Sequence, residues 1–167
     1  MSNLINPINY LKVELKFKNI AVLQLIFILC FWTSTTLAQC WTSDLSEDEQ
    51  LAVTRETFET QLFAESIEAA KCYLDEFPLG NSREEMLYLK AESFRKSGKL
   101  NDAVKGYDEL MISYPASNEY LEKVMFHKGV LQARIKKYSD SMNSLKIFLI
   151  KFPSSSYANE AYYWLGY

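Results

Sequence analysis

The sequence predicts an all-α protein made of stacked copies of one helix–turn–helix unit, and three recurring features indicate this fold class. An aromatic residue followed by proline returns at an almost constant interval, as Phe77-Pro78, Tyr114-Pro115 and Phe152-Pro153. These prolines lie 37 and 38 residues apart, a period in the range of helical repeat architectures. A small residue follows each proline by 13 or 14 positions, at Ala91, Gly129 and Gly166. Seven positions after the first two of these small residues, the sequence has a turn.

The first helix of each unit is predicted to begin shortly after the proline, where a polar stretch can cap it. The capping stretches are Gly80-Asn81-Ser82, Ser117-Asn118 and Ser154-Ser155-Ser156. Ser82 and Glu85 have the spacing of a capping box. Upstream, residues 46–49 are predicted to begin the first helix of the chain, because acidic side chains are favourable at a helix N-terminus.

The second helix of each unit is predicted to follow a turn, at Ser97-Gly98-Lys99 in one unit and Lys136-Lys137 in the next. The amphipathic stretches assigned to second helices are residues 67–77, 104–114 and 142–152. Each of them ends at an aromatic-proline pair, because proline disfavours helical geometry in the residue before it.

The same alignment predicts a core that is buried between neighbouring units, since repeats of this kind bury apolar area only against one another. The residues expected to be mostly buried are Ile67, Ala70, Leu74, Phe77, Leu87, Ala91, Phe94, Ala103, Tyr107, Leu110, Tyr114, Val124, Gly129, Leu145, Phe148 and Phe152.

The spacing of bulky, small, aromatic and proline positions in one unit resembles the tetratricopeptide repeat. Those positions are Leu87, Lys90, Ala91, Phe94, Gly98, Ala103, Tyr107, Leu110 and Pro115, of which Lys90 and Leu110 depart from the family pattern. The following unit matches more loosely, and residues 162–166 open a further copy. The resemblance covers residues 46–167 and implies a right-handed α-solenoid, incomplete at its C-terminus, that binds proteins.

The long period and the loop sequences are similar to the repeats of two cell-envelope families. One is the lipoprotein subunit of the outer-membrane β-barrel assembly machinery, and the other is the cell-division coordinator that works with the Tol-Pal system. This resemblance implies an extracytoplasmic scaffold and does not choose between the two families.

Residues 1–38 have the layout of a signal peptide. Lysines precede an apolar run over residues 20–32, and a stretch of small and polar residues ends at Ala38. The apolar run is short for a membrane-spanning helix, so cleavage after Ala38 is favoured over an uncleaved anchor. Residues 39–45 are then expected to form a flexible linker before the repeat domain.

Cys40 raises the alternative of a lipoprotein signal, in which this cysteine takes a lipid after cleavage. Gln39 argues against lipidation, because the residue before a lipidated cysteine is usually small. A membrane is therefore expected as a partner only through an N-terminal anchor or this lipid. An oxidising compartment could pair Cys40 with Cys72, but their expected positions, in a flexible segment and in a helix, favour two unpaired cysteines.

The composition argues against nucleic-acid binding and against catalysis. Without residues 1–38 the chain has 15 basic and 20 acidic residues and no basic stripe, so nucleic acid is not an expected partner. The only histidine, His127, has no Cys, Asp or Glu at ligand spacing, and no glycine-rich phosphate loop occurs. We therefore expect no metal, no cofactor and no enzymatic activity.

In the tetratricopeptide family the first helix of each pair lines a concave surface, and the resemblance implies a partner-binding groove there. The residues expected in this groove are Tyr88, Glu92, Arg95, Lys96, Phe126, Val130, Arg134 and Tyr163. Aromatic side chains supply large contact area, and arginine adds directional hydrogen bonds. The alternative is that some of these aromatics pack between repeats, because a shift of one residue in register turns them inward.

Two functions follow from these observations. The first is a non-catalytic envelope scaffold or adaptor that presents its groove to protein partners. The second is the repeat module of a larger envelope enzyme whose catalytic domain lies beyond residue 167.

Overall fold

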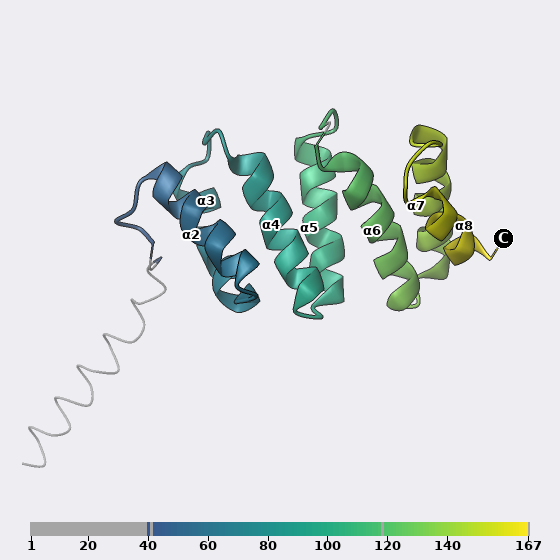
Figure 1. Cartoon of the computed structure of the whole chain (residues 1–167), viewed down its shortest axis with the longest axis horizontal. Coiled ribbons are helices and arrows are strands. Elements are labelled where there is room, and N and C mark those ends of the chain that lie inside the picture. Colours follow the sequence, from purple (N-terminus) through teal and green to yellow (C-terminus); the bar gives the residue numbers. More distant parts are fainter. Residues whose placement is uncertain (1–39, 41, 118, 167) are drawn as a thin grey trace, which may run out of the picture. The chain divides into compact units, whose positions relative to one another are not determined.

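The computed structural model describes residues 40, 42–117 and 119–166, and this part of the chain contains helices and no strands. The helices are α2 (Glu47–Glu59), α3 (Phe63–Glu76), α4 (Arg83–Lys96), α5 (Leu100–Ser113), α6 (Leu121–Arg134), α7 (Tyr138–Lys151) and α8 (Ala158–Leu165). They form one compact unit of helical hairpins, α2 with α3, α4 with α5 and α6 with α7, followed by α8. Figure 1 shows the hairpins arranged in a row, with consecutive helices running in opposite directions. The predicted α-solenoid of helix–turn–helix repeats is confirmed.

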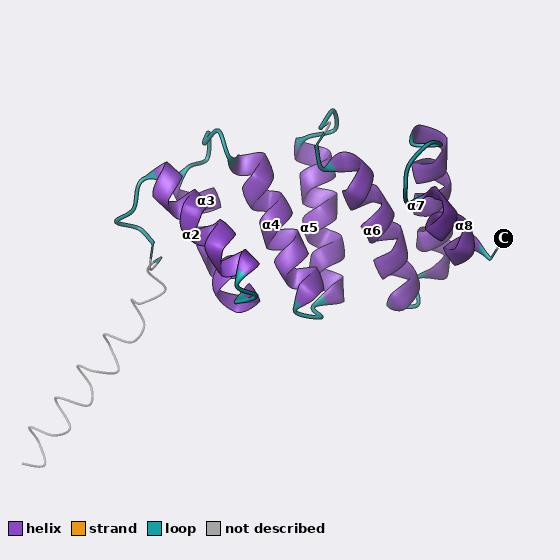
Figure 2. Ribbon diagram, in the orientation of Figure 1, coloured by secondary structure: helices purple, strands orange, loops and turns teal. Residues whose placement is uncertain are grey.

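We call the first helix of each hairpin an A helix (α2, α4, α6 and α8) and the second a B helix (α3, α5 and α7). All loops within hairpins lie at one edge of the row, and all loops between hairpins lie at the opposite edge (Figure 2). The same positions therefore recur at the same height in successive repeats, 37 or 38 residues apart.

The B helices end where the sequence predicts. The aromatic residue before each proline is the C-cap, at Phe77, Tyr114 and Phe152. The backbone of each C-cap is no longer helical, with φ between −132° and −115°. The backbone N–H of each C-cap still donates to the carbonyl of the residue four positions earlier, so the last helical hydrogen bond is made by the residue directly before the proline.

The starts of the A helices differ in part from the prediction. Ser46 does form a capping box with Glu49 at the beginning of α2. Ser82 precedes α4, but its side chain makes no capping hydrogen bond, so the predicted capping box with Glu85 is wrong. The guanidinium of Arg55 in α2 instead donates a hydrogen bond to each carboxylate oxygen of Glu85.

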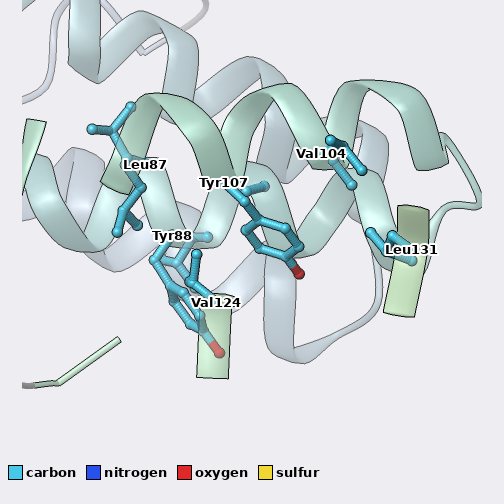
Figure 3. Close-up of a cluster of buried hydrophobic side chains, with 10 residues drawn as sticks. Leu87, Tyr88, Val104, Tyr107, Val124 and Leu131 are labelled. Atoms are coloured by element: carbon cyan, nitrogen blue, oxygen red, sulfur yellow. The ribbon is translucent and has the colours of Figure 1, made fainter. Parts of the chain in front are cut away.

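The predicted core is confirmed, because every residue assigned to it is buried or half-buried. The largest cluster joins residues of α4, α5 and α6, including Leu87, Tyr107 and Val124 (Figure 3).

Small residues allow the helices of a hairpin to approach closely. A Cβ atom at Gly129 would lie 2.6 Å from Cδ2 of Leu145, and one at Gly106 would lie 2.9 Å from Cβ of Ala91.

The third small residue does not lie inside a helix. Helix α8 ends at Leu165, and Gly166 is its C-cap with a left-handed φ of 81°. Helix α8 has eight residues and corresponds to the first eight of the 14 residues of α4 and α6.

The prediction of two unpaired cysteines is wrong, because Cys40 and Cys72 form a disulfide. Their Cα atoms are 5.4 Å apart, within the usual range for such a bond. Residues 42–45 form a turn in which Thr42 is fully buried, and its carbonyl accepts a hydrogen bond from the side chain of Gln50. The part of the expected flexible linker that the structure describes is thus packed against the first hairpin.

Charge is distributed unevenly among the repeats. Residues 40–77, which include the first hairpin, contain ten acidic and two basic residues, whereas residues 78–115 contain six of each. Residues 116–153, which include the third hairpin, contain seven basic and three acidic residues. The sign of the charge therefore changes along the stack.

Within the described residues, no helix is both long and apolar enough to cross a membrane. The proposed leader, residues 1–38, lies outside the described residues.

Candidate functional site

The two aromatic residues predicted for the middle of the groove lie between repeats. Tyr88 of α4 stacks on Tyr120, the residue that precedes α6, with ring centroids 4.3 Å apart. Phe126 of α6 stacks in the same way on Tyr157, the residue that precedes α8, with centroids 4.7 Å apart. Both Tyr88 and Phe126 are buried, so the expectation that they form an exposed ladder is wrong. The alternative of packing between repeats is the arrangement that the structure shows.

Glu92 of α4, also predicted for the groove, is buried at the centre of a polar network that joins three helices. Its carboxylate accepts hydrogen bonds from Arg95 of the same helix, with an N–O distance of 2.6 Å, and from the hydroxyl of Tyr107 in α5. Nδ1 of His127 in α6 lies 3.2 Å from the carboxylate. These contacts leave the buried charge compensated, as burial requires.

Electrostatics in this network favour an ionised Glu92 beside neutral tyrosines. Burial acts to raise the pKa of Glu92, but hydrogen bonds from His127, Arg95 and Tyr107 outweigh it, and the pKa lies well below its usual value. Burial, followed by the charge of Glu92, raises the pKa of Tyr107 above its usual value. Burial and the same charge also raise the pKa of Tyr88. Glu92 is therefore an ionised carboxylate that Arg95 and Tyr107 hold in place through hydrogen bonds.

The remaining predicted groove residues are accessible. Lys96, Arg134 and Tyr163 are exposed, whereas Arg95 and Val130 are half-buried. Together with the Arg55 and Glu85 ion pair and Lys123, these side chains form the accessible surface of the A helices, which we call the A-helix face. Five of its side chains are basic and one, Glu85, is acidic, so the face is mainly basic.

Several residues of this region were missed by sequence reasoning. Tyr120 and Tyr157 follow their prolines by five and four positions, and this recurrence of tyrosine was a usable signal for the inter-repeat stacks. Lys123 donates to the hydroxyl of Tyr88 at 2.5 Å and lies over its ring, with Nζ 5.1 Å from the centroid. His127, for which the sequence predicted only that it is not a metal ligand, links α6 to the buried carboxylate.

A hollow at one edge of the stack is lined by one predicted groove residue, Lys96. The other residues around it are Phe58, Glu59, Gln61 and Phe63, from α2, α3 and the turn between them. No group of three or more His, Cys, Asp or Glu side chains within the described residues could hold a metal ion.

Comparison with known proteins agrees with this geometry. The tetratricopeptide repeat family matches residues 85–117, which span α4, α5 and the following proline. This segment is therefore similar to a tetratricopeptide repeat, and the structure repeats the same hairpin before and after it. Such repeats generally mediate protein–protein interactions and are typically non-catalytic modules. No curated protein matches the chain.

Proposed function

We propose that this protein is a non-catalytic, extracytoplasmic scaffold or adaptor that binds protein partners through its A-helix face. The observation that carries the proposal is the row of tetratricopeptide-like hairpins, one of which matches the family directly. Rigid inter-repeat contacts, such as the stack of Tyr88 on Tyr120, fix the A helices relative to one another. A surface of this kind is preorganised for a partner, which lowers the cost of binding.

The disulfide between Cys40 and Cys72 supports export, because disulfides persist mainly in oxidising compartments. It also supports a protein without a lipid on Cys40, since one sulfur atom cannot be part of both a disulfide and a thioether. Of the two envelope families that the sequence resembles, a soluble scaffold of the cell-division type fits this cysteine chemistry better than a lipoprotein.

The proposed export can be tested by trapping thiols in cells with an alkylating reagent before lysis. We expect Cys40 and Cys72 to be protected from alkylation until a reductant is added. Immediate alkylation of both cysteines in the folded, full-length protein would contradict an oxidising compartment.

The binding face can be tested by site-specific photo-crosslinking in cells. A crosslinking amino acid at Lys96 or Arg134, which occupy equivalent positions in α4 and α6, is expected to give the same protein adducts. The matched controls are Lys105 and Lys146, which are exposed on the B helices α5 and α7. Adducts that form equally from the control positions would remove the A-helix face as the binding surface.

A charge-reversal experiment adds a quantitative comparison. The double variant Lys96→Glu and Arg134→Glu should lose about tenfold in affinity for the crosslinked partner, because charged residues at an interface affect its complementarity. The double variant Lys105→Glu and Lys146→Glu changes the net charge equally and should retain binding. Equal losses in the two variants would show that only total charge matters.

A further inference from the structure

The histidine of this chain, His127, lies against the buried carboxylate of Glu92. Nδ1 of its ring is 3.2 Å from Oε1 of Glu92, across the junction between the second and third hairpins. The equivalent residue of α4 is Leu89, which is buried. An apolar side chain thus fills this position in the preceding repeat, so the fold alone does not require an imidazole there.

The contact with Glu92 determines which nitrogen of the imidazole can change its protonation. Burial opposes ionisation of Glu92, but hydrogen bonds from His127, Arg95 and Tyr107 keep the pKa of its carboxyl well below the usual value. The ionised carboxylate can only accept hydrogen bonds, so Nδ1 of His127 carries a proton in the neutral imidazole as well as in the charged one. The proton that is gained or lost therefore belongs to Nε2.

The position of the ring allows Nε2 to take part in binding. The side chain of His127 is 16% exposed and that of Glu92 is 2% exposed, so the ring extends from the buried network toward the surface. Within the part of the chain that the structure describes, Nε2 has no hydrogen-bond partner. His127 follows Lys123 by four residues and precedes Arg134 by seven, so it shares the side of α6 that contributes these two residues to the A-helix face.

Charged and titratable groups of three neighbouring segments surround the ring. Glu92 belongs to α4, and Arg95 of the same helix binds the other side of its carboxylate. The ring centroid of Tyr107 in α5 lies 6.4 Å from that of His127, and Tyr157, before α8, lies edge-on at 6.0 Å. Since Arg95 already balances the charge of Glu92, a second proton on His127 would give this network a net positive charge.

The other charged groups near the ring belong to α6 and α8. Lys128 pairs with Asp108 of α5, and Glu160, the one charged residue of α8, accepts a hydrogen bond within its own helix. Lys123, one turn before His127, is basic. Among the described residues, Glu92 is the acidic group within hydrogen-bond distance of the ring, so a second anion at this place has to come from a partner.

We propose that Nε2 of His127, when it carries a proton, is a hydrogen-bond donor on the A-helix face for a carboxylate of a partner protein. This proposal rests on the proposed function, because it describes the chemistry of the same face. The basic side chains of the face attract an acidic segment, and the oriented imidazole adds a directed, charge-assisted hydrogen bond. The complex then binds one proton more than the free protein, so affinity rises as the pH falls, by up to about tenfold per pH unit.

The orientation of the ring is tested by NMR on the unsubstituted chain with isotope-labelled histidine. A single set of imidazole signals is expected, because His127 is the only histidine of the sequence. At about pH 8, where an ordinary imidazole is neutral, the proton should be on Nδ1, and acidification should add a proton to Nε2. A neutral imidazole that is protonated on Nε2 would overturn the proposal, since Glu92 would then not orient the ring.

The ligand is tested with a short peptide of alternating Glu and Ser, and the matched control peptide alternates Gln and Ser. The acidic peptide should move the midpoint of the His127 titration to higher pH, because its carboxylates favour the protonated ring. Its affinity, measured by the anisotropy of a pH-insensitive dye, should be about fivefold higher at about pH 6 than at about pH 8. Binding without a shift of the midpoint, or no binding of the acidic peptide, would overturn the proposal. Free glutamate at the same carboxylate concentration should leave the midpoint unchanged, and an equal shift would overturn the assignment to a polypeptide segment.

Two variants separate the role of Nε2 in binding from a role in folding. His127→Asn keeps an amide donor near the place of Nδ1 and lacks Nε2, and His127→Leu introduces the apolar residue of the equivalent position in α4. In both, the affinity for the acidic peptide should change by less than about twofold between these pH values. A folded variant that keeps the full pH dependence would overturn the proposal. Failure of the proposed function would appear differently, as crosslinks that form equally from the B-helix positions, whatever the titration of His127.

Discussion

At the scale of single residues, Glu92 shows how this fold keeps a charge in its interior. The carboxylate is nearly inaccessible, yet it receives donors from α4, α5 and α6. Removing one partner of such a group is costly, because the remaining charges stay buried without compensation. Glu92 therefore links two hairpins through polar contacts, since Tyr107 belongs to α5 and His127 to α6.

We expect Glu92→Gln to lower the free energy of unfolding at pH 7 by about 3 kcal/mol, the usual cost of breaking a buried ion pair. Because the pKa of Glu92 is depressed in the folded state, its contribution is present above the unfolded value of 4.5 and is lost as the pH falls below it. Urea unfolding of the unsubstituted chain should therefore show decreasing stability between about pH 5 and pH 3.

The Glu92→Gln variant should show a flatter dependence on pH over that interval, since the titrating group is absent. Glu65→Gln, at an exposed position of α3, is the matched control and should reproduce the slope of the unsubstituted chain. Parallel pH profiles for Glu92→Gln and the unsubstituted chain would contradict this account of the network.

The residue scale is also where sequence reasoning was weakest. The alignment on proline placed Tyr88, Glu92 and Phe126 on A helices, but it could not determine how much of each side chain was covered. That coverage comes from Tyr120 and Tyr157, which lie in the segments before the next A helices and have no place in the repeat pattern. A local pattern fixes the direction of a side chain within its own helix, whereas burial depends on the neighbouring repeat.

At the scale of helices and turns, the three hairpins share one backbone conformation. A residue with a left-handed φ lies between the A and B helices of each hairpin, at Gln61, Gly98 and Lys136, with φ values of 64°, 79° and 65°. Only the middle repeat has glycine there, and a Cβ atom at Gly98 would meet nothing within 4 Å. The site thus isolates the cost of backbone conformation from the cost of packing.

We expect Gly98→Ala to destabilise the protein by about 1 kcal/mol, because an L-residue is strained in the left-handed region. Lys136→Ala should leave stability nearly unchanged, since both residues carry a Cβ atom in the same conformation. Thermal unfolding of the two variants measures the difference. A loss of similar size at Lys136 would mean that side-chain contacts, and not the backbone, decide stability at these turns.

Helix boundaries were the part of the fold that the sequence predicted best. Proline has a strong local effect on the residue before it, so the ends of α3, α5 and α7 follow from Pro78, Pro115 and Pro153 alone. Helix starts were harder, because serine can cap a helix in several ways and Ser82 caps none with its side chain. The disulfide could not be predicted from spacing, since Cys40 meets Cys72 only through the path of the chain around the first hairpin.

At the scale of the whole molecule, the disulfide ties the segment before α2 to the second helix of the first hairpin. Cys40 and Cys72 are 32 residues apart, and closing a loop of that length removes conformational entropy from the unfolded chain. Stability in a stack of repeats is roughly a sum of terms between neighbours, so a terminal hairpin depends on such a constraint more than an internal one does.

Reduction of the disulfide is expected to lower the free energy of unfolding by about 3 to 4 kcal/mol, the value for a loop of this size. The measurement is chemical denaturation with and without a reductant. Cys72→Ser should match the reduced protein and should not respond to the reductant. An unsubstituted chain that is equally stable in both conditions would show that the bridge does not constrain the unfolded state.

The change in charge from an acidic first hairpin to a basic third hairpin gives the stack an electric dipole along its length. The field of a charged molecule that approaches from solution exerts a torque on this dipole before the two surfaces meet, so encounters begin with a preferred orientation. Dissolved salt shortens the range of that field to about 10 Å at 0.1 M ionic strength. The rate constant for association should therefore decrease as salt is added. The lifetime of a complex that has already formed depends mainly on its short-range contacts.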